Sequence, residues 1–191
     1  MREAAIAVSM PSDPKRGGCR AYATIFVVAL LVRAAWGVTR FIRADDRTVL
    51  EFPDEEQYWM MARSLWEGEG LKDELGFRAT RMPLYPAVLA PFTALPSGIP
   101  AAKALHWIVG AAAAALTGAA AGAWFDRRTG LLAGLLVAFD PFLTFSSSLL
   151  LTETPFVTAL VVLWRLLLPL TRRDGAAAGL GRWIGVGVAS A

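Results

Sequence analysis

The chain has 191 residues, of which 55% are hydrophobic and 18% are charged, and its mean hydropathy is positive. Such a composition lies outside the range of ordinary soluble domains and predicts an all-α integral membrane protein with several spans in a helix bundle. Residues 39–100 hold ten acids and seven bases, a net charge of −3, and the remaining residues carry +6. This asymmetry is typical of membrane topology and does not favour a nucleic-acid partner.

Residues 1–20 are polar and basic, with two prolines and two glycines, and we expect a disordered cytoplasmic tail. The only cysteine, Cys19, precedes the first apolar run, so it has no disulfide partner and does not mark a lipoprotein cleavage site. The apolar run at 21–38 predicts an uncleaved anchor, because a long polar leader precedes it and Arg33 interrupts it. Arg33 either snorkels to the interface or neutralises an acid in the bundle.

Three later apolar runs predict spans at about residues 101–125, 130–150 and 155–170, and residues 182–191 resemble the beginning of another. The first of these runs carries a stripe of small residues that lets a second helix approach closely: Gly110, Ala114, Gly118 and Gly122. Within the 130–150 run, Asp140 followed by proline favours a helix that restarts after a kink; the alternative is an acid that faces a cavity. His106 alone forms no metal site, and we expect a packed or interfacial side chain.

The run at 82–95 is apolar but short and interrupted by prolines, so it either crosses the membrane or lies at its surface. The second alternative puts the basic groups at 126–128 and 171–174 on the cytoplasmic side with the N-terminus, as the positive-inside rule prefers. It also puts the loop 39–100 and the turn near 151–155 together on the outer face. We therefore expect a multi-pass protein of the cell (inner) membrane.

Residues 54–67 of this outer loop have the periodicity of an amphipathic helix. Its apolar stripe consists of Tyr58, Met61, Ala62, Leu65 and Trp66, and two glycines, at 68 and 70, follow it. A tethered helix of this kind is expected to lie in the membrane interface.

The acids at the start of this helix have two interpretations. Asp54 follows a proline and precedes Gln57 by three residues, which is typical of a helix cap. Other charged groups of the outer face indicate a site instead. Arg78 and Arg81 each carry a guanidinium that can hold a phosphate bidentately, and Glu153 lies in the second outer turn.

Three motifs occur in order along the chain. They are D-E-x-x-Y-x-x-x-A-x-x-L-x-x-G-x-G from Asp54, R-x-P-L-Y-P from Arg81, and LLLTETPF around Glu153. Together they resemble the GT-C membrane glycosyltransferases, closest to the protein mannosyltransferase and aminoarabinose transferase type, over about residues 21–170. The resemblance implies transfer of a sugar from a polyprenyl-phosphate donor to a lipid, glycan or protein acceptor on the non-cytoplasmic face of the bilayer.

The resemblance also implies roles for single residues. It implies that Asp54 is the main catalytic acid, that Glu55 is the alternative or additional acid for that role, and that Glu153 matches a second acid. The departing phosphate is expected to contact Arg81, with Arg78 as the weaker candidate.

The motif tyrosines Tyr58 and Tyr85 are further candidates for binding substrate. A divalent metal held by the two outer acids stays open, since no His or Cys cluster supports it.

The chain is much shorter than members of that family, and we expect an N-terminal fragment that carries the donor-side half of the site. Two alternatives stay open. The fragment is inactive by itself, or the chain is a non-enzymatic membrane protein, such as a transporter half or an assembly subunit, in which Asp54 caps a helix.

Overall fold

The computed structural model describes residues 14–43, 50–73, 76–78 and 80–171. Within these ranges the protein is all-helical, as predicted, apart from turns and one isolated antiparallel bridge between Lys72 and Arg78. The helices are α1 (Pro14–Arg43), α2 (Pro53–Trp66), α3 (Leu84–Thr93), α4 (Gly98–Trp124), α5 (Arg127–Phe139), α6 (Pro141–Ser146) and α7 (Glu153–Thr171).

Two of the described helices are long and apolar enough to cross a membrane: the 25 residues Cys19–Arg43 of α1 and the 27 residues of α4. At about 1.5 Å per residue, each is longer than the roughly 30 Å hydrocarbon core of a bilayer. Because α1 begins at Pro14, residues 14–20 are helical and not a disordered tail. Residues 1–13 of the expected tail and the expected segment 182–191 lie outside the described residues.

The expected span at 130–150 consists of two helices, α5 and α6, which are separated at Asp140. Asp140 has extended backbone angles, and its carboxylate accepts the backbone N–H of Leu143 at 2.7 Å. Pro141 occupies the first helical position, where its missing N–H costs nothing. The prediction that Asp140 caps a restarted helix is confirmed.

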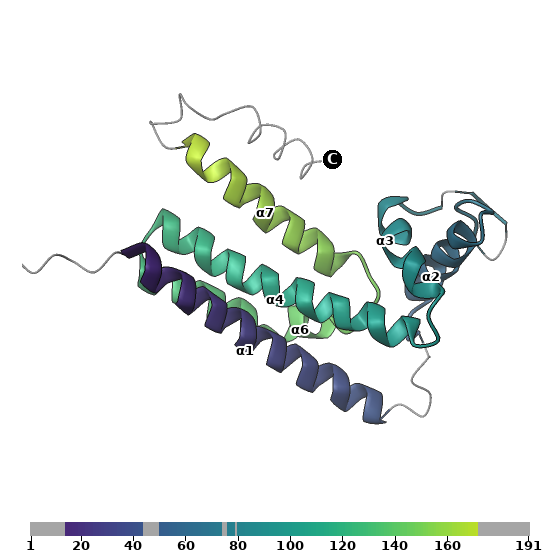
Figure 1. Cartoon of the computed structure of the whole chain (residues 1–191), viewed down its shortest axis with the longest axis horizontal. Helices are drawn as coiled ribbons and strands as arrows, with labels where there is room; N and C mark the ends of the chain where they lie inside the picture. Colours follow the sequence, from purple (N-terminus) through teal and green to yellow (C-terminus); the bar gives the residue numbers. More distant parts are fainter. Residues whose placement is uncertain (1–13, 44–49, 74–75, 79, 172–191) are drawn as a thin grey trace, which may run out of the picture.

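The α4 helix lies at the centre of the bundle, with α1, α5 and α7 packed around it (Figure 1). The stripe of small residues on α4 makes this packing possible. A Cβ added at Gly130 of α5 would lie only 2.6 Å from the Gly118 carbonyl oxygen, so the two backbones touch where neither has a side chain. The predicted packing role of the stripe is confirmed.

Arg33 of α1 lies inside this bundle and does not snorkel to an interface, since it is 1% exposed. Its guanidinium donates to the Val137 and Ala138 carbonyl oxygens, each at 3.3 Å, at the end of α5. A cation at this position satisfies carbonyls that have no partner within their own helix. Arg33 is therefore a packing residue of the α1–α5 contact.

The α2 and α3 helices form a small unit at the end of the bundle where α4 begins (Figure 1). The apolar stripe of α2 packs on α3, with Tyr58, Met61 and Ala62 buried, while Trp66 stays 55% exposed. The stripe is covered by α3. That this helix lies in the membrane interface stays a prediction. With 10 residues, α3 is about 15 Å long, too short to cross about 30 Å of hydrocarbon.

Candidate functional site

Asp54 and Arg81 meet on the exposed edge of α2. Asp54 lies in the first turn of the helix, and its carboxylate forms an ion pair with the guanidinium of Arg81, from the segment before α3. The Arg81 Nε donates to Gln57 Oε1 at 2.9 Å, and the guanidinium carbon lies 5.6 Å from the centre of the Tyr58 ring. Positions 54, 57 and 58 share one helix face because they are spaced i, i+3 and i+4.

The capping role expected for Asp54 is not observed. The N-cap residue is Phe52, whose side chain makes no cap hydrogen bond, and its backbone N–H donates to Glu55 Oε2 at 3.3 Å. Glu55 occupies the third helical position, where an acid reaches back to the start of its helix. The Asp54 carboxylate is therefore available for contacts outside the helix.

The geometry around Arg81 suits an anionic ligand. Gln57 and Tyr58 hold the guanidinium from two sides, and its Nη1 has no hydrogen-bond partner among the residues that the structure describes. The Arg81 side chain is 33% exposed and that of Asp54 is 55% exposed. An incoming phosphate can thus reach a guanidinium that is already oriented, beside a carboxylate that is open to solvent.

Tyr58 and Tyr85 lie beneath this pair. Their rings pack edge to face, with 4.9 Å between the centroids, and both residues are only 7% exposed. The Tyr85 hydroxyl lies 2.9 Å from His106 Nε2 of α4. Burial, and then the charge of Glu55, raise the pKa of Tyr85 far above its ordinary value, so its hydroxyl stays neutral. Direct contact of either ring with substrate, as the motifs imply, requires this unit to open.

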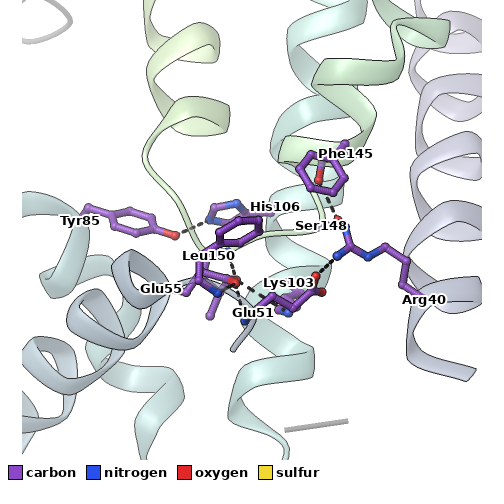
Figure 2. Close-up of polar contacts among 10 residues, drawn as sticks. Arg40, Glu51, Glu55, Tyr85, Lys103, His106, Phe145, Ser148 and Leu150 are labelled. Atoms are coloured by element: carbon purple, nitrogen blue, oxygen red, sulfur yellow. Dashed lines mark hydrogen bonds and ion pairs between the residues drawn. The ribbon is translucent and has the colours of Figure 1, made fainter. Parts of the chain in front are cut away.

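Glu55 lies in the junction of the α2–α3 unit with the bundle (Figure 2). It is 0% exposed. Its Oε1 accepts the Leu150 N–H at 2.7 Å and lies 3.7 Å from Lys103 Nζ of α4. Its Oε2 accepts the backbone N–H of Glu51 at 2.8 Å as well as that of Phe52. This placement differs from that of a base that shares the substrate with Asp54.

Arg40 makes a second polar contact at the same junction (Figure 2). Its Nη1 donates to Ser148 Oγ at 2.9 Å, and its Nη2 pairs with the Glu51 carboxylate. The guanidinium also lies 4.8 Å from the centre of the Phe145 ring. Glu51 is therefore part of the contact between α1 and the residues just before α2.

Glu153 and Arg78 do not contact the Asp54–Arg81 pair within the described residues. Glu153 is exposed at the first position of α7. Its charge is a small cause of the raised pKa of Tyr85, after burial, Glu55 and Tyr58. Arg78 is exposed in the short bridge with Lys72. The structure thus brings Asp54, Arg81 and Tyr58 together and leaves Arg78 apart.

No group of three or more His, Cys, Asp or Glu side chains gathers in the part of the chain that the structure describes. The divalent metal that the sequence left open stays a prediction.

Sequence reasoning did not select Gln57, Lys103 or Arg40, which hold the candidate residues in place. A signal for Lys103 was present, because it is the one charged residue of the apolar run 101–125. A charge inside such a run is costly and implies a specific partner. No comparable signal identifies Arg40, since basic residues at the end of a span are common.

No protein-family model, curated protein or solved structure matches the chain. The likeness to GT-C glycosyltransferases is therefore carried by the three sequence motifs, and the geometry of their residues is the physical basis for a functional proposal.

Proposed function

We propose that this chain carries the donor side of a membrane glycosyltransferase site. The reaction moves a sugar from a polyprenyl-phosphate donor to a hydroxyl of a lipid, glycan or protein acceptor on the non-cytoplasmic face. One observation carries the proposal: an exposed carboxylate, Asp54, lies beside an oriented guanidinium, Arg81, at one end of an apolar helix bundle.

The proposed chemistry requires one base and one cation. The acceptor hydroxyl attacks the anomeric carbon, and Asp54 takes its proton as the new C–O bond forms. The bond between that carbon and the phosphate oxygen breaks on the opposite face, so the configuration inverts and the lipid phosphate leaves with the electron pair. Arg81, released from its ion pair with Asp54, binds the departing phosphate on that opposite face. A base of this kind contributes about 10²- to 10⁴-fold to the rate.

The proposal includes a multi-pass topology. In Figure 1 the start of α1, the α4–α5 turn and the end of α7 lie at the end of the bundle opposite the α2–α3 unit. The basic pair Arg127 and Arg128 begins α5 at that opposite end. A basic end is expected to face the cytoplasm, which puts the Asp54–Arg81 pair outside.

The topology is testable by thiol labelling of intact cells in a background with Cys19→Ser. We expect an impermeant thiol reagent to label Glu56→Cys and not Arg127→Cys. Labelling of position 127 would contradict the topology.

The enzyme proposal is tested with the protein in vesicles that contain labelled polyprenyl-phosphate mannose or polyprenyl-phosphate aminoarabinose. Asp54→Asn is expected to lower sugar transfer by at least about 10²-fold. Glu56→Gln is the matched control, because Glu56 is an exposed acid of the same helical turn. Normal transfer by the Asp54→Asn variant would refute the role of Asp54 as the base.

A non-enzymatic function is the second candidate, because the Asp54–Arg81 pair also joins α2 to the segment before α3. In that case the pair is a structural link in a transporter half or an assembly subunit. Neither donor would then be consumed by the wild-type protein, and Asp54→Asn would change only its thermal stability.

A further inference from the structure

We propose that Glu55 and Lys103 form a positioning junction, which fixes the first turn of α2 against α4 and residues 147–152 and so sets the direction of Asp54. Glu55 is then a positioning residue and not a second base. The structural part of this inference stands by itself, and its kinetic part rests on the proposed function.

The contacts of Glu55 keep a substrate hydroxyl away from its carboxylate. A carboxylate has two oxygens with about four lone-pair sites. Oε2 accepts the N–H groups of Glu51 and Phe52, and Oε1 accepts that of Leu150 and faces Lys103 Nζ. Three backbone N–H groups and the ammonium of Lys103 thus surround the carboxylate, and the residue is 0% exposed. A substrate hydroxyl could reach it only after several of these bonds break.

The same bonds join segments that are distant in sequence. Leu150 lies 95 residues from Glu55 and belongs to the irregular segment between α6 and α7. Lys103 belongs to the first part of α4, where its side chain is 5% exposed and its ammonium lies 5.7 Å from the centre of the Phe41 ring of α1. Glu55 therefore links α2 to α4 and to the segment between α6 and α7 at the point where these meet (Figure 2).

Polar contact between α2 and the bundle runs entirely through Glu55 in the part of the chain that the structure describes. The other two polar links do not involve α2 itself, because Tyr85–His106 attaches α3 and Arg40–Glu51 attaches the residue pair before the helix. The remaining attachment of α2 is apolar and non-directional. Among the polar contacts of the described residues, the Glu55 bonds thus fix the rotation of the first turn against the bundle, and Asp54 lies in that turn.

The structural part is tested by amide hydrogen exchange on the full chain in detergent. Glu55→Ala is expected to speed exchange at Leu150 by about ten- to hundredfold, the loss expected for a buried bond to a charged acceptor. Glu56→Ala is the control and should leave that amide unchanged. Unchanged exchange at Leu150 in Glu55→Ala would overturn the junction, whether or not the protein transfers sugar.

The kinetic part is tested by a double-mutant cycle of Glu55→Gln and Lys103→Met in the vesicle assay. In Glu55→Gln the Asp54 carboxylate is expected to lose its direction toward the substrate. We expect kcat to fall by about 10²-fold and KM for the donor to stay within about twofold of wild type. Because the two residues act as one unit, the double variant should have a kcat no lower than Glu55→Gln.

Independent, multiplicative losses of kcat in the double variant would overturn the junction. Absence of transfer by the wild-type protein would instead count against the proposed function, and the hydrogen-exchange result would still decide on the junction. A combined variant that unfolds is recognised by its thermal melt, and Lys103→Met alone then supplies the test. It should lower kcat while the Leu150 amide keeps its Glu55 acceptor, and an unchanged kcat in that variant would overturn the junction.

Discussion

Removal of the Tyr85 hydroxyl is expected to weaken the attachment of the α2–α3 unit to the bundle. In Tyr85→Phe, the His106 Nε2 loses the partner that lies 2.9 Å away. His106 is 3% exposed, so water cannot replace the lost bond without opening the packing. A buried polar atom left without a partner costs about 1–3 kcal/mol.

The magnitude translates into a measurable thermal shift. We expect a loss of about 2 kcal/mol, which for a chain of this size lowers Tm by roughly 4–8 °C. The assay is a reversible thermal melt in detergent, followed by intrinsic fluorescence. Tyr58→Phe is the matched control, because Tyr58 has the same exposure and packs on the same ring but has no hydroxyl hydrogen bond among the described residues.

A double-mutant cycle with His106→Leu separates the bond from general packing. Because His106→Leu removes the group that Tyr85→Phe leaves unpaired, the double variant should lose less stability than the sum of the two single variants. Equal losses in Tyr85→Phe and Tyr58→Phe, together with strict additivity in the cycle, would refute the reasoning.

Three further predictions concern the site, the bundle and the α4–α5 turn. Arg81→Lys is expected to raise KM for the donor about tenfold in the vesicle assay, because an ammonium lacks the planar guanidinium fork that binds phosphate. An equal rise in KM for Arg78→Lys would contradict the assignment of Arg81 to the donor phosphate. Gly130→Ala should lower stability by about 1–3 kcal/mol in a thermal melt, because the new Cβ meets the Gly118 carbonyl. This loss is expected although alanine has the better helix propensity. A stabilised variant would contradict the close contact between α4 and α5. The backbone N–H groups at the start of α5 lower the pKa of Asp126 below 3.8. The contribution of Asp126 to the free energy of unfolding is therefore fully present above about pH 4 and is lost as the pH falls through the lowered pKa. Asp126→Ala should thus destabilise the protein more at pH 7 than at pH 3. An equal loss of stability at both pH values would contradict this role of Asp126.

The helix starts and packing faces could be predicted from the sequence wherever residues close in sequence define them. Asp140 with Pro141 is such a signal, since a cap and a residue without an N–H both belong to a helix start. The stripe along α4 is another, because small residues every four positions have a packing use whatever the partner helix is. These features depend on residues that are close in sequence, and the structure agrees with them.

The surface that covers the α2 stripe could not be predicted in this way. Periodicity shows that Tyr58, Met61 and Ala62 share an apolar face, but lipid and protein satisfy such a face equally well. The covering surface is α3, which begins 18 residues after α2 ends. Only the tertiary contact distinguishes an interfacial helix from one side of a small helical unit.

Asp54 and Glu55 show the same limit at the candidate site. Consecutive residues of a helix point about 100° apart, so at most one of two adjacent acids can face a given ligand. The sequence left the choice open, and the environments decide it. Asp54 is exposed and pairs with Arg81, whereas Glu55 is buried, accepts three backbone N–H groups and lies beside Lys103. A general base must lie within reach of the proton that it takes, so the exposed Asp54 fits the proposed role better than the buried Glu55.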